Sequence, residues 1–147
     1  MTEALLLAGR AAELDEVPVG AVIVFEDQII GRGFNLRETI QKPISHAEIH
    51  AVLQAASHLN SWRLYDCDLY VTLEPCLMCL GAMSQARIRK CIFGALDVKG
   101  GALSLGYPFQ SDERLNHRFE VEYFRNDYCG NILTEFFRKK RQKSKSL

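Results

Sequence analysis

Two short motifs, thirty residues apart, constrain this 147-residue chain more than any other feature. The first is His46-Ala47-Glu48 and the second is Pro75-Cys76-Leu77-Met78-Cys79. Together they supply one imidazole, two thiols and one carboxylate. A structural zinc site normally has four Cys or His ligands, whereas a catalytic site has three and leaves one position for water. The motifs therefore predict a fold that brings two distant segments together around a catalytic metal, with His46, Cys76 and Cys79 as its ligands.

The residues around the first motif predict a helix from about His46 to Leu59, which Ser45 can cap. Its apolar positions recur with helical periodicity and predict a buried stripe formed by Ile49, Val52, Leu53, Ala56 and Leu59. His46 and Glu48 would flank this stripe at the N-terminal end of the helix. A metal and a substrate placed under that end could be reached by both side chains.

In the second motif, Pro75 suits the first position of a helix that runs to about Arg87, because a missing N–H costs nothing there. Cys76 and Cys79 then share a face near the positive end of the helix dipole, which favours thiolates. A lone Cys-x-x-Cys also fits a redox pair or half of a structural zinc site, and a lone His-x-Glu is common by chance. Taken jointly, the motifs favour catalytic zinc, with Glu48 as a proton shuttle that does not bind the metal. This combination is the known signature of zinc-dependent nucleobase deaminases.

The length predicts one domain, residues 1–147, with a core that needs no disulfides. Five cysteines, two of them assigned to the metal, leave an odd number without a pairing pattern, which indicates a reducing compartment. We find no signal-peptide pattern, and the longest apolar run, around Val19–Phe25, is too short to span a bilayer. We therefore expect a cytoplasmic protein that has no membrane partner.

The formal net charge is zero, but the charges are unevenly distributed along the chain. The segment Arg138–Lys145 carries six Lys or Arg and no acid, so the rest of the chain has 12 basic and 18 acidic residues. A cationic end of this kind fits either a solubilising, partly disordered terminus or a contact with a phosphate backbone. From the residues alone, both interpretations stay open.

Periodicity and turn residues predict the remaining elements. We expect helices from Thr2 to about Asp15 and from Asp127 to about Arg141, and strands at Val19–Phe25, Gln28–Phe34, Leu69–Leu73, Lys90–Ala95 and Phe119–Tyr123. Gly31 and Gly33 indicate a close backbone approach or a bulge in the second strand. The segment Asp97–Arg118 is expected to be mostly loop with one turn of helix. This order predicts an α/β fold in which helices flank a mixed five-stranded sheet.

Segments along nearly the whole chain match one family in order: Glu16–Val22, Asn35, His46–Ile49, Leu69–Cys76, Gly81–Met83, Phe93–Ala95, Asn116–Arg118 and Phe136–Arg138. Through these segments the chain resembles the bacterial tRNA-specific adenosine deaminases (TadA type), which convert the anticodon wobble adenosine to inosine. The metal motifs are shared with cytidine, cytosine and guanine deaminases. The Leu69–Cys76 string and the Phe136-Phe137-Arg138 ending are more particular to the tRNA enzymes.

The resemblance implies a three-layer α/β/α, cytidine-deaminase-like fold, a homodimer and one Zn²⁺ per subunit. It implies hydrolytic deamination of wobble adenosine 34 in a tRNA anticodon stem-loop, that of tRNA-Arg, with release of ammonia. By position, Asn35 should hydrogen-bond the flipped-out nucleotide, Asn116 should line the same pocket, and backbone groups around Ala47 should read the base. Residues 136–147 resemble the family's tRNA-contacting terminal helix, in which we expect Arg138 and its basic neighbours, more than the two Phe, to contact RNA.

Two departures from the family pattern limit what can be carried over. The chain opens at Met1 almost inside its first helix, which a late start codon or a natural truncation would explain. The loop Lys99–Ser104 lacks the usual glycine just before the serine, so substrate contacts there are the least transferable. Asn35 also fits a turn that ends the second strand, and Asn116–Arg118 also fits a merely structural loop.

Two rival functions remain at the level of sequence. The first is deamination of free cytidine, cytosine or guanine, which has little use for a basic tail and lacks the contacts needed to extrude a base from an RNA loop. The second is a non-catalytic RNA-binding subunit that keeps zinc for folding. Such a subunit would be expected to lose its general acid, yet Glu48 is present.

Overall fold

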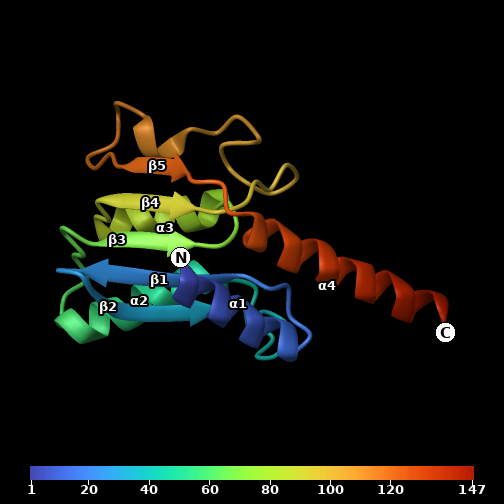
Figure 1. Ribbon diagram of the computed structural model, residues 1–147. Coiled ribbons are helices and arrows are strands. Elements are labelled where there is room, and N and C mark those ends of the chain that lie inside the picture. The colour runs from blue at the N-terminus through green and yellow to red at the C-terminus, as the bar shows by residue number, and fades with distance from the viewer.

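A mixed five-stranded sheet forms the centre of the computed structural model, which describes residues 1–147 (Figure 1). In chain order the strands are β1 (Gly20–Phe25), β2 (Gln28–Phe34), β3 (Asp68–Val71), β4 (Lys90–Phe93) and β5 (Glu120–Tyr123). Their order across the sheet is β2-β1-β3-β4-β5. The strand β1 is antiparallel to both of its neighbours, whereas β3, β4 and β5 are parallel. This confirms the predicted α/β fold.

Helices cover both faces of the sheet, as predicted for a three-layer arrangement (Figure 1). The helices are α1 (Thr2–Glu13), α2 (Ala47–Leu59), α3 (Leu77–Ala86) and α4 (Asp127–Lys145), and one 3₁₀ turn, η1, spans Phe109–Ser111. A Cβ added at Gly20 would collide with α1, whereas one added at Gly33 would collide with α2. Because successive side chains of a strand alternate between faces and Gly33 pairs with Ala21, α1 and α2 lie on opposite faces.

Both predictions for the glycines of β2 are confirmed. A Cβ at Gly31 would meet the backbone of α2 at Ala51, and a Cβ at Gly33 would meet the carbonyl oxygen of Ala47. The pairing of β1 with β2 also shifts register between Ile23 and Val24, as a bulge does. The two glycines therefore let the backbone of α2 pack directly on β2, which sets where its N-terminal end lies.

Replacing Gly33 by alanine tests this close approach. We expect Gly33→Ala to lower the free energy of unfolding by about 1–3 kcal/mol, the usual cost of overpacking a core, because helix and strand backbones must separate. Urea denaturation monitored by circular dichroism measures the loss. The control is Gly9→Ala in α1, where nothing lies within 4 Å of an added Cβ and a gain of up to about 1 kcal/mol is expected. Equal stability of the two variants would contradict the packing described here.

The two helices of the motifs begin slightly later than predicted. The N-cap of α2 is His46 in an extended conformation, and Ser45 makes no capping bond; its hydroxyl instead lies 2.5 Å from Nε2 of His50. The N-cap of α3 is Cys76, so Pro75 precedes the helix and does not occupy its first position. The prediction that Ser45 caps the first of these helices is therefore wrong, and each helix begins directly after a predicted metal ligand.

The predicted buried stripe of α2 is also wrong in part. Leu53 is 60% exposed, and the face turned to the sheet consists of Ala47, Glu48, Ala51 and Ala55. Apolar periodicity weighs large side chains most heavily, but the glycines of β2 leave room only for a helix face of small residues. Ile49, Val52, Ala56 and Leu59 pack at the margin of the core. Glu48 consequently lies within the buried face and does not flank it.

One edge of the sheet collects the chain segments that carry the motifs. Because β2 and β3 are both antiparallel to β1, the carboxyl ends of β2, β3, β4 and β5 meet the beginning of β1 at this edge. Crevices at the carboxyl ends of strands are where open α/β sheets bind ligands. Beyond this edge α4 runs away from the sheet (Figure 1). It is longer than predicted, yet none of the helices is both long enough and apolar enough to cross a membrane.

Candidate functional site

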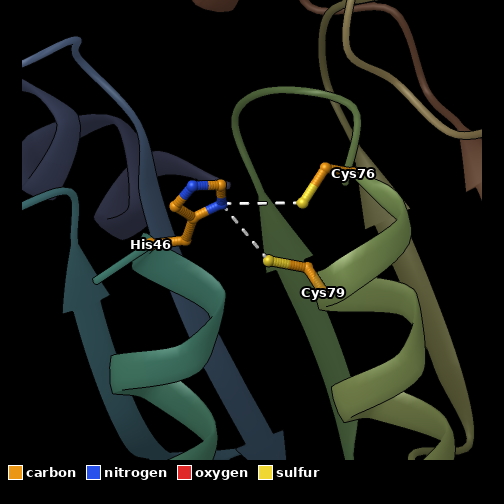
Figure 2. Close-up of side chains that lie close together, drawn as sticks. All are labelled: His46, Cys76 and Cys79. Atoms are coloured by element: carbon orange, nitrogen blue, oxygen red, sulfur yellow. Dashed lines mark hydrogen bonds between the residues drawn. The ribbon is translucent and has the colours of Figure 1, made fainter. Parts of the chain in front are cut away.

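Three side chains from the two motifs meet where α2 and α3 begin (Figure 2). The Nδ1 atom of His46 lies 3.6 Å from Sγ of Cys76 and 3.5 Å from Sγ of Cys79. All three possible ligand atoms lie within 4.8 Å of one another. His46 and Cys76 are the N-caps of their helices and Cys79 lies in the first turn of α3, so the helix ends position all three.

The spacing of these atoms fits a tetrahedral zinc ion. Zinc binds thiolate sulfur at about 2.3 Å and imidazole nitrogen at about 2.0–2.1 Å, which at a tetrahedral angle separates the two atoms by about 3.5–3.6 Å. The two separations from Nδ1 of His46 match this value. One imidazole with two thiolates is a donor set that suits zinc. Only three residues form the cluster, as in catalytic sites that leave one position for water.

Interactions within the cluster already favour a thiolate. Hydrogen bonding to the thiol of Cys79 and then to His46 lowers the pKa of Cys76 to about 4, against the opposing effect of burial. The same interaction with Cys76, together with burial, raises the pKa of Cys79. Hydrogen bonding to Cys76 also raises the pKa of His46. The geometry therefore favours the thiolate form of Cys76 where a cation would bind.

Glu48 is 4% exposed and lies on the buried face of α2, one residue inside its N-terminal end. Burial raises the pKa of its carboxyl group, and hydrogen bonds to its own main chain and to Cys79 oppose that shift. The carboxylate is not part of the three-residue cluster. A buried acid beside a three-ligand site can hold or pass on a proton without occupying a ligand position.

A cavity of about 270 Å³ opens over the cluster and contains Glu48. Its lining residues come from the loops at the carboxyl edge of the sheet, from the first turn of α2 and from α4: Asp15, Glu16, Val17, Val19, Asn35, Arg37, Glu38, His46, Ala47, Glu48, Leu73, Glu74, Cys76, Asp97 and Lys140. At its rim, Nζ of Lys140 lies 3.5 Å from a carboxylate oxygen of Asp15. The basic helix therefore reaches the same cavity as the metal cluster.

Two of the predicted substrate contacts, Asn35 and Ala47, line this cavity. The side-chain amide of Asn35 donates to the carbonyl of Val17 at 3.2 Å and accepts from the main-chain N–H of Arg37 at 3.1 Å. These bonds fix its orientation and leave its second amide N–H free. Asn35 thus occupies a turn after β2, which was the structural role considered for it, and it also lines the cavity.

The other two predicted contacts lie outside the cavity. Asn116 is exposed in the loop before β5, next to His117, whose Nε2 lies 2.7 Å from the carbonyl oxygen of Ile88. Arg138 lies on α4 and forms two hydrogen bonds with Glu135, at 2.7 and 3.1 Å. The basic side chain of α4 that does reach the cavity is Lys140. Of the two Phe, Phe136 is buried and Phe137 is 43% exposed.

Sequence reasoning missed two buried carboxylates of the cavity, Glu16 and Glu74. Glu16 accepts a hydrogen bond of 2.5 Å from the main-chain N–H of Thr39 and so holds the loop after β2. Glu74 stands directly before Pro75 and holds the loop after β4. Each is an acid next to a buried apolar run, which is the one signal that could have singled it out.

A mixed sheet covered on both faces, with a His/Cys/Cys cluster and a buried glutamate at the start of two helices, defines the class of zinc-type nucleobase deaminases. The MafB19-like deaminase family matches this chain over residues 1–141. A solved structure of a tRNA:A34 deaminase, from studies of A-to-I editing at the wobble position, superposes with a TM-score of 0.85 at 41% identity, covering 90% of this chain and 97% of that one. A guanine deaminase from Bacillus subtilis gives a TM-score of 0.63 at 36% identity, with coverages of 72% and 67%.

Named relatives narrow the class to one family. A tRNA-specific adenosine deaminase of Bacillus subtilis is 46% identical over 147 residues, covering 99% of this chain and 91% of the relative. One of Aquifex aeolicus is 45% identical over 138 residues, covering 94% and 91%. The chain belongs to the bacterial tRNA-specific adenosine deaminase family (TadA type), and the resemblance drawn from its segments is confirmed.

Proposed function

We propose that this protein hydrolytically deaminates the wobble adenosine (position 34) of a tRNA anticodon stem-loop, that of tRNA-Arg, to inosine and releases ammonia. The observation that carries the proposal is the three-residue cluster with the buried Glu48 beside it in one cavity. The substrate is supported by relatives that are 45–46% identical and named tRNA-specific adenosine deaminases. The basic helix at the cavity rim supports an RNA substrate over a free base.

The residues of the cavity divide the chemistry between them. His46, Cys76 and Cys79 would hold one Zn²⁺, which lowers the pKa of a water molecule so that hydroxide is available near neutral pH. Glu48 would take one proton from water and pass it to a ring nitrogen of adenine as the water oxygen bonds to the amine-bearing carbon. Glu48 would then take the remaining proton from the added hydroxyl group and deliver it to the amino group, so that a carbonyl forms, the C–N bond breaks and ammonia leaves.

The walls of the cavity would bind and orient the nucleotide. Asn35 offers its free amide N–H to the flipped-out nucleotide, and the backbone around Ala47 would read the base. Flipping a base out of its stack costs a few kcal/mol. Stacking and hydrogen bonds to the edge of the base in a closed pocket can offset that cost. Asn116, exposed on its loop, and Arg138 would contact the RNA outside the cavity.

The same proposal includes a homodimer in the cytoplasm. Exposed apolar side chains gather on the first turn of α3 and on the adjoining loop after β4: Leu77, Met78, Leu96, Val98, Leu105 and Tyr107. Exposed apolar surface of this kind marks an interface, and a second copy of the chain would cover it. All five cysteines are free thiols, which suits a reducing compartment. Sedimentation equilibrium at micromolar concentration would show twice the chain mass, and a monomer would refute the dimer.

The decisive experiment offers the purified protein an anticodon stem-loop of tRNA-Arg that carries wobble adenosine, in parallel with free adenosine, cytidine and guanine. We expect inosine in the RNA alone. The similarity to guanine deaminase makes a free-base activity the second candidate. Deamination of a free base or nucleoside with unchanged RNA would keep the zinc chemistry and refute the tRNA substrate.

Replacing Arg138 by alanine tests the basic helix. If its guanidinium contacts one phosphate, we expect Arg138→Ala to weaken stem-loop binding about fivefold at 0.1 M salt and to reduce the slope of log K against log salt by about 0.7–1. Fluorescence anisotropy at several salt concentrations measures both. Arg89→Ala is the matched control, because Arg89 is also exposed and pairs with an acid, Asp68, at the opposite end of the sheet. An unchanged slope for Arg138→Ala would exclude that phosphate contact.

A further inference from the structure

The side chain of Glu74 links two segments that are distant in sequence by hydrogen bonds. It lies two residues before the metal ligand Cys76, is 3% exposed, and lines the cavity. One carboxylate oxygen accepts from the main-chain N–H of Asp97 at 3.2 Å and from the hydroxyl of Ser104 at 2.5 Å. The other accepts from the main-chain N–H of Ser104 at 2.9 Å. The carboxylate is thus occupied by three donors, all of them from the loop after β4.

That loop packs closely against the carboxylate of Glu74. Its backbone at Gly101 passes so close that a Cβ there would collide with the Glu74 carboxylate. Asp97 turns the chain by accepting from the main-chain N–H of Lys99 at 3.2 Å and of Gly100 at 3.0 Å. The main-chain N–H of Ala102 then donates to the carbonyl of Pro75 at 3.0 Å. The loop is therefore fitted against the turn that leads into the metal cluster.

Glu74 is distinct from the other buried acid of the metal site. Glu48 lies on α2, and its hydrogen bonds involve its own main chain and Cys79 and not this loop. The oxygens of Glu74 face main-chain N–H groups that can only donate, so the group is an acceptor that organises backbone. An unmet buried N–H is costly, which makes this carboxylate hard to replace.

We propose that Glu74 is a positioning residue for the reaction: its carboxylate holds residues 97–104, of which Asp97 lines the cavity, in place and thereby sets the affinity for the nucleotide. This inference rests on the proposed function of the cavity. The loop after β4 departs from the family pattern just before Ser104. We assign this loop a role in substrate binding that depends on the hydrogen bonds that the hydroxyl and the main-chain N–H of Ser104 donate to Glu74.

The test replaces Glu74 by glutamine, which keeps the size of the side chain. Whichever way the amide turns, its NH₂ group faces one of two main-chain N–H donors, so at least one bond is lost. We expect amide hydrogen exchange within residues 97–104 to accelerate at least about tenfold, as the loss of a bond to a charged acceptor implies. We expect KM for the wobble-adenosine stem-loop to rise about tenfold, while kcat stays within about threefold and zinc remains at one ion per chain.

Two further variants sharpen the result. Ser104→Ala removes only the hydroxyl bond and should raise KM in the same direction by a smaller factor. Glu113→Gln makes the same chemical change at an exposed carboxylate of the next loop segment and should change neither exchange nor KM. A fall in kcat or in zinc content at unchanged KM, or unchanged exchange in residues 97–104, would overturn the proposal. If the wild-type protein leaves the stem-loop unmodified, the proposed function fails, while the exchange measurement still decides whether Glu74 anchors the loop.

Discussion

Glu48→Ala is expected to lower kcat on the stem-loop by at least about 10³-fold while zinc stays bound at one ion per chain. General acid–base groups contribute about 10²–10⁴-fold each, and Glu48 is assigned two proton transfers in this reaction. Zinc should remain, because the carboxylate is not one of the three residues that form the cluster. Single-turnover kinetics and elemental analysis of the same preparation measure both quantities.

A control variant shows whether the loss of activity is specific to Glu48. Glu113→Ala removes an exposed carboxylate far from the two motifs in sequence and should keep the wild-type rate. Should Glu48→Ala lose its zinc or retain full activity, the role of Glu48 as proton shuttle would be wrong. Loss of zinc would instead indicate that the carboxylate supports the ligands directly, which its burial beside Cys79 would then explain.

Cys79→Ser should abolish both metal binding and turnover. Cys79 is fully buried at the first turn of α3, with its sulfur 3.5 Å from Nδ1 of His46. A serine hydroxyl stays protonated where a thiolate is needed, so only two of three ligands remain. We expect zinc affinity to fall by more than about 100-fold, since even changes to the partners of a ligand cost about 10–100-fold. Competition with a chromogenic chelator measures the affinity.

Stability provides a second readout for the same variant. Because zinc binds only the folded protein, a chelator should lower the unfolding temperature of the wild type but leave Cys79→Ser unaffected. The control is Cys67→Ser, another fully buried cysteine, whose sulfur lies 3.6 Å from the carbonyl oxygen of Tyr65, a contact that a hydroxyl can keep. Stoichiometric zinc in Cys79→Ser would remove Cys79 from the ligand set.

Comparison of α2 with β2 shows why some predictions held and others did not. Gly31 and Gly33 were predicted to allow close approach, and they do. The buried stripe of α2 was misplaced, because periodicity identifies apolar positions but not how much space the neighbouring strand leaves for them. In this helix the space admits alanine, so Leu53 points outward and Glu48 inward.

The C-terminal helix α4 also shows what the sequence alone cannot predict about a charged surface. The run Arg138–Lys145 was recognised from composition, but the helix that carries it, α4, continues to Lys145, beyond the predicted end near Arg141. Its sequence could not reveal which basic side chain reaches the cavity, because that depends on how α4 packs beside α1. The structure places Lys140 there, paired with Asp15, whereas Arg138 pairs within its own helix.

The sequence by itself predicted His46, Cys76 and Cys79 as metal ligands and Glu48 as the acid beside them, and it determined the order of helices and strands and the family. These follow from short motifs and local periodicity, which act within a few residues. The tertiary structure alone decided that segments thirty residues apart meet at 3.5–3.6 Å, and that Glu74 ties the loop after β4 to the metal turn. Such contacts depend on strand register and on the close packing of α2 and α3 against the sheet, because burial and hydrogen bonding between distant segments are set only when the whole core is assembled.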